Sequence, residues 1–236
     1  MRTLGILGGM SWESSAQLYK LLNRQVAERL GGLHSADLLL RSVNFAEIEA
    51  LQRAGDWAGA AHLLGTAGRG LKSAGAQALL IATNTMHKVA DEVEQLSALP
   101  LIHIVDATAE ALKAAGHTRV GLLATRYTME EDFYRGRMRD RHGIELLTPP
   151  PVQRLEVHRV IFEELCRGQI SPASRAFYLQ TVQDLAAAGA EAVILGCTEI
   201  CLLLDPDMPA ALPLFDSTAL QARAAVEWML GGTTDV

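Results

Sequence analysis

The sequence GAQALLIATNT at residues 75–85 aligns without gaps on GAEAVILGCTE at residues 189–199, an offset of 189 − 75 = 114 residues. A second pair, LGILGG at 4–9 and VGLLAT at 120–125, has the offset 120 − 4 = 116. A glycine between an Ala-rich helical pattern and an aliphatic run is typical of a helix–strand junction, which also recurs by chance in α/β chains. Two pairs in the same order at nearly equal offsets favour two copies of one α/β unit.

Short aliphatic runs alternate with longer amphipathic stretches along the rest of the chain. Continuous apolar runs are typical of strands that are covered on both faces of a parallel sheet, and the alternation with helical patterns is typical of doubly wound α/β folds. We expect strands at 3–7, 37–42, 78–82, 101–104, 119–124, 145–147, 192–196 and 213–215, and helices at 12–30, 57–73, 107–114, 129–141, 154–167, 174–188 and 218–230.

The fold class predicted from this pattern is α/β, with two pseudo-symmetric Rossmann-like or flavodoxin-like domains that contain parallel sheets. Open α/β sheets bind ligands at the carboxyl ends of their strands, so we expect the active site in the cleft between the domains. Residues 1–105 and 210–236 would form the first domain, and residues 106–209 the second. We expect the two units to exchange strands, with the stretch 214–230 returning to the first.

Composition and charge exclude several classes of protein. The chain has 236 residues, of which 49% are hydrophobic and only 5% aromatic, and its net charge is 21 − 27 = −6. An acidic chain without basic clusters is a poor ligand for nucleic acid or for an anionic membrane. No apolar run approaches the ~18–20 residues of a membrane span, and three cysteines are an odd number for a disulfide framework. We therefore expect a cytoplasmic protein with reduced thiols.

Cys197 is the first candidate for chemistry. It follows a predicted strand and precedes Thr198, which could begin a helix. Unpaired amides at a helix N-terminus stabilise a thiolate, whereas the alternative is a buried, unreactive thiol, the commonest state of a free cysteine. Cys166 and Cys201 resemble core thiols. The spacing of Cys197 and Cys201 lacks a matching pair of ligands, so no metal site is expected.

Thr83, Asn84 and Thr85 occupy the repeat position that corresponds to Cys197 and its neighbours. Their hydroxyl, amide and backbone N–H groups could bind a carboxylate. The alternative is a simple helix cap, a role that Thr and Asn commonly have.

Other polar segments carry weaker signals. The glycine-containing loop at 8–13 could bind an anion, but it lacks the full dinucleotide-binding fingerprint, and a small carboxylate fits as well. His87 could act as a base, although a helix histidine without a catalytic role is the better interpretation; Lys88 follows it. Gln52 and Arg53 end a helical stretch and resemble solvated surface.

These motifs resemble the cofactor-independent aspartate/glutamate racemase family over essentially the whole chain. The segments that carry the resemblance are GILGGMSWES at 5–14, TNTMHK at 83–88, GCTEI at 196–200 and, weakly, FDS at 215–217. The family resemblance implies a small-molecule substrate, a homodimer, and α-proton transfer between two facing cysteines without pyridoxal phosphate, metal or other cofactor.

The resemblance also implies roles for individual residues. Cys197 matches the second catalytic cysteine, and Thr83 stands where the first cysteine belongs, which is the main departure from the usual pattern. The residues that match substrate-binding positions are Met10, Gln52, Asn84, Thr85, Thr198 and Glu199.

The leading hypothesis is an amino-acid racemase that acts on aspartate, glutamate or a related amino acid through Cys197 and Thr83. Because a hydroxyl is harder to ionise than a thiol, we expect faster turnover in the direction in which Cys197 abstracts the α-proton and Thr83 donates. Two alternatives remain: a related isomerase or decarboxylase of small dicarboxylates such as maleate or malonates, and a non-catalytic amino-acid-binding protein.

Overall fold

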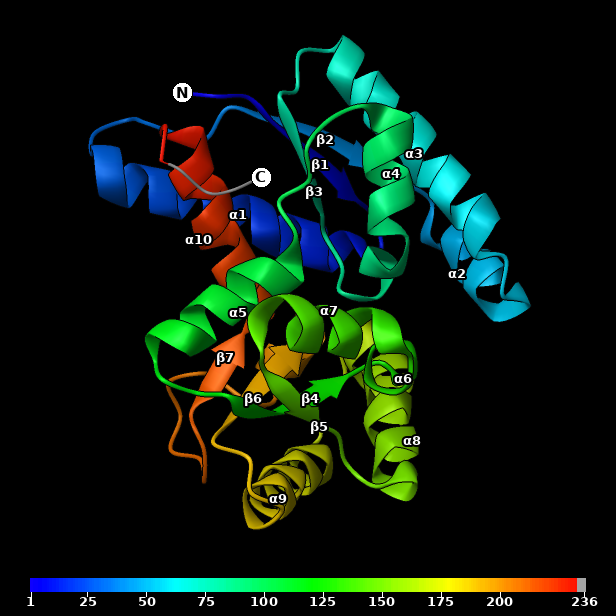
Figure 1. Cartoon of the computed structure of the whole chain (residues 1–236), viewed down its shortest axis with the longest axis vertical. Helices are drawn as coiled ribbons and strands as arrows, with labels where there is room; N and C mark the ends of the chain where they lie inside the picture. Colours follow the sequence, from blue (N-terminus) through cyan, green and yellow to red (C-terminus); the bar gives the residue numbers. More distant parts are fainter. Residues whose placement is uncertain (233–236) are drawn as a thin grey trace. The chain divides into compact units, whose positions relative to one another are not determined.

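The structure is a computed structural model that describes residues 1–232. The chain divides into two compact units, one made of Met1–Ile104 and the chain from Gln221 on, the other of Val105–Leu220 (Figure 1). Each unit contains one sheet, and every strand pairing is parallel. This confirms the predicted α/β class with a parallel sheet in each half.

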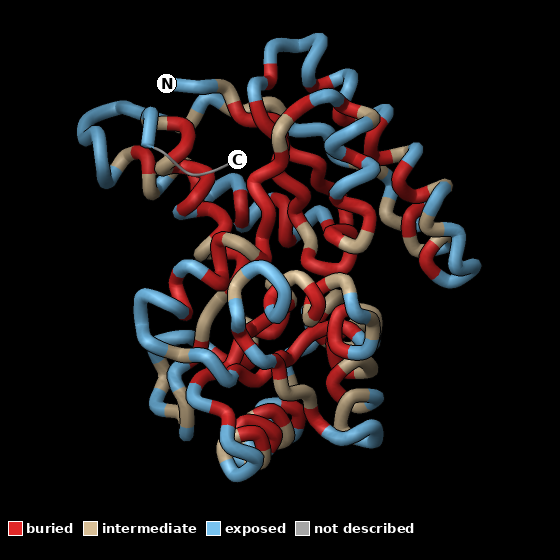
Figure 2. Tube along the Cα trace, in the orientation of Figure 1, coloured by how far each residue is buried: buried red, intermediate tan, exposed pale blue. Residues whose placement is uncertain are grey.

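The first unit contains a three-stranded sheet in the order β2-β1-β3. Its strands β1 and β3 are buried along their whole length, whereas β2 is half-buried to exposed (Figure 2). The elements of this unit are β1 (Leu4–Gly8), α1 (Trp12–Leu30), β2 (Leu38–Ser42), α2 (Phe45–Ala54), α3 (Trp57–Ser73), β3 (Ala78–Ile81), the 3₁₀ helix η1 (Thr85–Val89), α4 (Ala90–Ser97) and most of α10 (Ser217–Met229).

The second unit contains a four-stranded sheet in the order β5-β4-β6-β7. Strand β6 is buried throughout, and β4 is buried after its first residue. The elements of this unit are α5 (Ile104–Ala114, counted here from its second residue), β4 (Arg119–Ala124), α6 (Arg126–Glu130), α7 (Asp132–His142), β5 (Glu145–Leu147), α8 (Pro151–Arg159), the π helix η2 (Val160–Glu164), the 3₁₀ turns η3 (Leu165–Arg167) and η4 (Thr198–Leu202), α9 (Pro172–Ala187), β6 (Ala192–Gly196) and β7 (Leu214–Asp216).

The strand registers reproduce the internal repeat. Leu4 of β1 pairs with Ala78 of β3, and Val120 of β4 pairs with Ala192 of β6. The two pairs are related by 120 − 4 = 116 and 192 − 78 = 114 residues, the offsets found in the sequence. The two sheets therefore share one topology and one register over these strands.

Gly5 and Gly121, which occupy the same position in the two repeats, have equivalent neighbours. A Cβ on Gly5 would lie 2.9 Å from a methyl carbon of Leu79, and a Cβ on Gly121 would lie 3.1 Å from a methyl carbon of Val193. Since 193 − 79 = 114, both glycines accommodate the equivalent residue of the neighbouring strand. Close packing of this kind leaves little room for a side chain at either position.

The predicted strand at 101–104 is wrong in length. Only Leu101 pairs in parallel fashion, with Leu79, and helix α5 begins already at Ile104. In the second sheet the equivalent contact, Val193 with Leu214, belongs to the full strand β7. In the first sheet a single bridge at Leu101 therefore stands where the second sheet has the strand β7, and helix α5 follows it.

The predicted second domain boundary at residue 210 needs correction. Strand β7 pairs with β6, so residues 210–220 belong with the second unit, and the chain returns to the first unit only at Gln221. Each unit contributes a helix to the other: α5 follows the Leu101 bridge of the first sheet, and α10 follows β7 of the second. The exchange therefore involves helices rather than the predicted strands, and residues 233–236 lie outside the described residues.

Helix boundaries differ from the predictions where the backbone is interrupted. The predicted helix 129–141 is two helices, α6 and α7, because Glu131 between them is extended (φ −88°, ψ 154°). The predicted helix 154–167 begins at Pro151 and continues as η2 and η3. Within residues 1–232, no helix combines the length and the apolar character that crossing a membrane requires.

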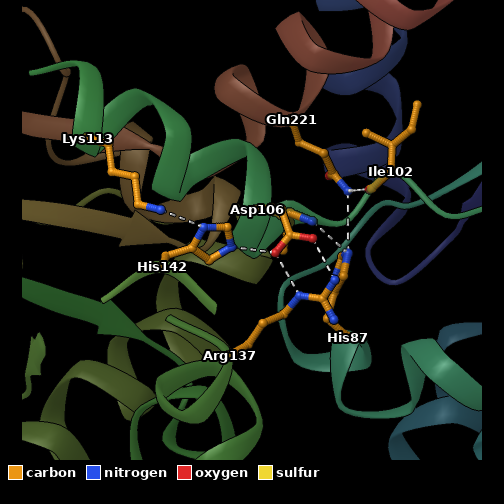
Figure 3. A network of polar contacts seen from close by, with 8 residues as sticks. His87, Ile102, Asp106, Lys113, Arg137, His142 and Gln221 are labelled. Atoms are coloured by element: carbon orange, nitrogen blue, oxygen red, sulfur yellow. Dashed lines mark hydrogen bonds and ion pairs between the residues drawn. The ribbon is translucent and has the colours of Figure 1, made fainter. Parts of the chain in front are cut away.

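A polar network fastens α5 to α7 inside the second unit (Figure 3). The carboxylate of Asp106 accepts hydrogen bonds from Nε and Nη2 of Arg137, at 2.8 and 2.5 Å, and from Nε2 of His142 at 2.8 Å. Nζ of Lys113 lies 3.3 Å from the other ring nitrogen of His142. Because the ammonium group can only donate, Nδ1 of His142 is the acceptor and its proton is on Nε2.

Candidate functional site

The loop after β1 is held by serine hydroxyls. Ser15 Oγ accepts the N–H of Gly9 at 2.8 Å and donates to the carbonyl of Ser11 at 2.9 Å. Gly9 has φ +91°, and a Cβ there would lie 2.2 Å from the carbonyl oxygen of Val43, so only glycine fits. Met10, predicted to bind substrate, is buried beside this fixed turn.

Thr83, Asn84 and Thr85 follow β3 as predicted. Thr83 is half-buried, whereas Asn84 and Thr85 are buried at the start of η1. Asn84 occupies the N-cap position, but within the described chain its side chain makes no capping hydrogen bond to η1. The helix-cap interpretation is therefore wrong for Asn84.

His87 holds the backbone of Thr83. Its Nδ1 lies 2.8 Å from the Thr83 carbonyl, and its Nε2 lies 3.2 Å from the backbone nitrogen of Ile104. Because a backbone N–H can only donate, Nε2 is the acceptor and Nδ1–H donates to Thr83. The side-chain amide of Gln221 donates to the Ile102 carbonyl at 2.9 Å and lies 3.4 Å from the same Nε2 (Figure 3). His87 is thus a buried, hydrogen-bonded positioning residue, a role that its spacing alone did not reveal.

Gln52 and Arg53 behave differently although they are neighbours on α2. The predicted surface location is wrong for Gln52, which is buried on the same helix face as Ile48 and donates to the sulfur of Met86 at 3.0 Å. The prediction is right for Arg53, whose exposed side chain pairs with Glu49 at 3.0 Å. Residues four apart on a helix share a face, and the apolar Ile48 was the sequence signal that Gln52 would be buried.

Cys197 follows β6, and its half-buried thiol lies 2.9 Å from Oε2 of Glu199. The hydroxyl of Thr198 donates to the same carboxylate oxygen at 3.0 Å. Burial, then the negative charge of Glu199, raises the pKa of the Cys197 thiol well above its ordinary value, and the neighbouring Cys166 adds to the shift. The predicted thiolate at a helix N-terminus is therefore wrong: η4 is one short 3₁₀ helix, and burial together with a carboxylate at contact distance outweighs its dipole.

The second unit also holds a polar pair at the repeat positions of His87 and His103. The rings of His87 and His103 lie 4.6 Å apart in the first unit. The equivalent of His87 is Cys201 (87 + 114). The equivalent of His103 is Asp216 (103 + 113), because Leu101 corresponds to Leu214 and 214 − 101 = 113. Cys201 and Asp216 are joined by a hydrogen bond. Burial raises the pKa of the Asp216 carboxyl, and it raises the pKa of the Cys201 thiol as well. Cys201 is thus half-buried and hydrogen-bonded rather than a simple core thiol.

Within each unit, several predicted residues lie together. Cys197, Thr198 and Glu199 meet through one carboxylate oxygen in the second unit, and in the first unit Gln52 contacts Met86 of η1, the helix that begins at Thr85. Among residues 1–232, no three His, Cys, Asp or Glu side chains are grouped so that they could hold a metal ion.

Comparison with known proteins extends this picture to the whole chain. A model of the Asp/Glu/Hydantoin racemase family matches residues 7–225. A candidate Asp/Glu racemase from Yersinia pestis is 51% identical with a TM-score of 0.92, covering 98% of this chain and 100% of that chain. An aspartate racemase homologue from Pyrococcus horikoshii OT3 is 32% identical with a TM-score of 0.85 and the same coverage.

Sequence comparison also finds a glutamate racemase of Pseudomonas putida KT2440. It is 30% identical over 155 residues, which are 63% of this chain and 56% of that protein. The family model covers nearly all of the described residues, and the two solved structures match over the whole fold. The chain therefore belongs to the Asp/Glu/Hydantoin racemase family.

Proposed function

We propose that the protein is a cofactor-independent racemase of aspartate, glutamate or a related amino acid, with Cys197 and Thr83 acting on opposite faces of the α-carbon. Membership of a racemase family and the repeat-related positions of Thr83 and Cys197 after β3 and β6 support this function. The observation that carries it is the contact between Cys197 and Glu199, because it gives the thiol proton an acceptor 2.9 Å away.

The proposed reaction balances without a cofactor. The Cys197 thiol passes its proton to the Glu199 carboxylate, and the resulting thiolate removes the substrate's α-proton. The Thr83 hydroxyl donates its proton to the opposite face of the carbanion. Its oxygen is then reprotonated from solvent, and the Glu199 carboxyl releases to solvent the proton that it took from Cys197, so both groups return to their starting states. An α-proton beside a carboxylate is a very weak acid, so fixed hydrogen-bond donors must stabilise the developing charge.

The predicted substrate-binding residues include donors for this task. Asn84, Thr85 and Thr198 offer an amide and two hydroxyls to the substrate carboxylates, and Met10 contributes apolar surface. Gln52 is uncharged. It would therefore distinguish a substrate with an acidic side chain from one with a neutral side chain by hydrogen bonds rather than by charge. Gln52, Asn84 and Thr85 are buried, which strengthens each hydrogen bond that they would make.

Proton NMR in deuterated water tests the proposal directly. With both enantiomers of aspartate and glutamate, the α-proton signal should disappear in the presence of the wild-type protein and persist with Cys197→Ala. Cys166→Ala, which removes another thiol of the same unit, is the matched control. Exchange that survives in Cys197→Ala would refute the role of Cys197.

Two further outcomes would replace racemisation by another function. Turnover of maleate or of malonates without turnover of amino acids would establish the isomerase or decarboxylase alternative. Calorimetric binding of an amino acid without α-proton exchange would establish a binding protein.

A further inference from the structure

The segment 195–201 of the second unit is closed at both ends by contacts with one residue, Asp216. At its start, Leu195 of β6 pairs with Asp216 of β7. Six residues later, the thiol of Cys201 in η4 donates a hydrogen bond to the Asp216 carboxylate. The predicted site residues 197–199 lie between these two contacts. The part of the chain that carries them is therefore a short loop tied down on either side.

Asp216 is itself firmly anchored. Its Oδ1 accepts the N–H of Thr218 at 2.8 Å, and the N–H of Ala219 donates to the same carboxylate, a geometry typical of a helix N-cap. Ser217, which is fully buried, donates from Oγ to the carbonyl of Leu195 at 2.9 Å. The carboxylate that receives the Cys201 thiol is thus fixed by the backbone of α10 and held beside β6.

The surroundings of Cys201 keep its thiol protonated. Burial, then the negative charge of Asp216, raises the pKa of this thiol, and the charges of Glu199 and Asp205 add to the shift. A thiol can donate only while it holds its proton. Cys201 therefore stays a donor, as its contact with Asp216 requires.

The first unit closes the equivalent segment at the same places. Subtracting 114 from 195 and 201 gives the segment 81–87, which ends at His87. The His87 ring lies 4.6 Å from the ring of His103, the equivalent of Asp216, and its Nε2 accepts from the backbone nitrogen of Ile104 at 3.2 Å. Different side chains thus meet at equivalent positions in the two units, which indicates that closing this segment is the task they share.

The anchored helix η4 determines where Glu199 lies. Helix η4 has only five residues, and a 3₁₀ helix of this length has little stability of its own. Ile200 is fully buried and donates its N–H to the Cys197 carbonyl at 3.1 Å, and Cys201 fastens the helix one residue later. The 2.9 Å contact between the Cys197 thiol and the Glu199 carboxylate therefore depends on the position of η4.

We propose that Cys201 and Asp216 are a pair of positioning residues that fix η4 and thereby hold the Glu199 carboxylate against the Cys197 thiol. The pair has the task that His87 has toward Thr83 in the first unit. Its effect on turnover rests on the proposed function, whereas its effect on the contact between Cys197 and Glu199 does not.

The pH profile of Cys197 alkylation by iodoacetamide tests the contact without any need for turnover. Peptide mass spectrometry separates Cys197 from Cys166 of η3, which with Tyr178 of α9 is the other titratable group beside it and is unchanged in every variant. Cys201→Ala should move the alkylation midpoint to lower pH by about 0.5 or more, because the Glu199 charge is no longer held at contact distance. Cys201→Ser retains a donor and should keep the wild-type midpoint.

Two combinations of variants show whether the effect runs through the pair and through Glu199. Asp216→Ala should move the midpoint as Cys201→Ala does, and the double variant should move it no further, since the two residues share one contact. In a Glu199→Gln background, Cys201→Ala should leave the midpoint where it is. Because Asp216→Ala also removes the cap of α10, the Cys201 variants decide the test if that variant does not fold.

Turnover supplies a second readout with a matched control. In Cys201→Ala the kcat of α-proton exchange should fall about tenfold with KM changed less than about twofold, and Cys201→Ser should restore it. Thr181→Val removes another buried hydrogen bond of the same unit, the 2.9 Å bond from the Thr181 hydroxyl to the Phe177 carbonyl in α9. It should lower stability to urea but leave both kcat and the Cys197 midpoint in place.

Four results would overturn the proposal. These are an unchanged midpoint in Cys201→Ala, additive shifts in the double variant, a shift that persists in the Glu199→Gln background, and an equal shift in Thr181→Val. A wild type without α-proton exchange would refute the proposed function instead, and the alkylation midpoints alone would then decide for or against the pair.

Discussion

The thiol of Cys197 donates to the carboxylate of Glu199, with Sγ 2.9 Å from Oε2. In this resting arrangement burial and the charge of Glu199 keep the thiol protonated, since both raise its pKa. Cys197 can act as a base only after its proton has moved, and the nearest acceptor is the group that raises its pKa. The contact thus makes Glu199 part of the proposed proton path.

Glu199→Gln should separate these two effects of the carboxylate. Removing the negative charge should lower the pKa of Cys197, although burial should still hold it above the ordinary value. The pH profile of thiol alkylation should therefore move to lower pH, while racemisation falls by about 100-fold because an amide cannot accept the proton. Glu163→Gln, at an exposed carboxylate, is the control. An unchanged or higher alkylation midpoint would refute this prediction.

Thr83 should make catalysis directionally unequal. Enantiomers have equal free energies in water, so kcat/KM must be the same in both directions, and the inequality has to appear in kcat. We expect the larger kcat where Cys197 abstracts and Thr83 donates. Thr83→Cys should narrow the ratio of the two values, and Thr83→Val should abolish turnover. Polarimetry from each pure enantiomer measures both rates, and equal kcat values in the wild type would contradict the prediction.

Two substitutions of His87 should distinguish positioning from stability. His87→Asn retains a donor at the place of Nδ1, whereas His87→Gln retains an acceptor near Nε2 but loses the bond to the Thr83 carbonyl. Each leaves one buried group unsatisfied and should cost about 1–3 kcal/mol of unfolding free energy. Only His87→Gln loses the hydrogen bond to the Thr83 carbonyl, so the kcat of this variant should be about tenfold lower than that of His87→Asn. Urea unfolding and kinetics test this; equal kcat values would exclude the positioning role.

Gly9→Ala should destabilise the protein far more than Gly55→Ala. Both glycines have positive φ, at +91° and +70°, but only at Gly9 would the new Cβ lie 2.2 Å from the Val43 carbonyl oxygen. We expect a loss of about 3 kcal/mol or more for Gly9→Ala, and of about 1 kcal/mol for Gly55→Ala. Urea denaturation at one pH compares the two variants. Equal losses of unfolding free energy in the two variants would show that the positive φ, and not the contact with Val43, is what disfavours alanine at residue 9.

Asp216 should make the protein less stable as pH rises. Its pKa is raised in the folded state by burial, so the folded chain binds more protons than the unfolded chain once the pH exceeds the unfolded value of ~3.9. The stability contribution is therefore complete below that pH and is lost as the pH rises through the raised pKa. Asp216→Asn keeps an acceptor for the N–H of Thr218 and should flatten this decline. Parallel pH dependences of the urea midpoints of wild type and variant would contradict it.

Local patterns predicted most elements because the decisive interactions are close in sequence. The ranges of α1, α3, β4, β5 and β6 agree with the predictions, since caps and uninterrupted apolar runs depend only on neighbouring residues. The predictions were wrong where a single residue breaks the pattern, as Glu131 does between α6 and α7. They were also wrong for the burial of Gln52, which depends on packing against η1 rather than on polarity.

The sequence by itself determined the α/β class, the two-fold repeat and the equivalence of Thr83 with Cys197, because a repeated strand–turn unit leaves its pattern along the chain. Tertiary structure alone decided which sheet contains β7, since strand pairing joins distant residues. It also decided the protonation of Cys197, the orientation of His87 and the hydrogen bond between Cys201 and Asp216. Each of these depends on burial and on charges or hydrogen-bond partners that come together only when the chain folds.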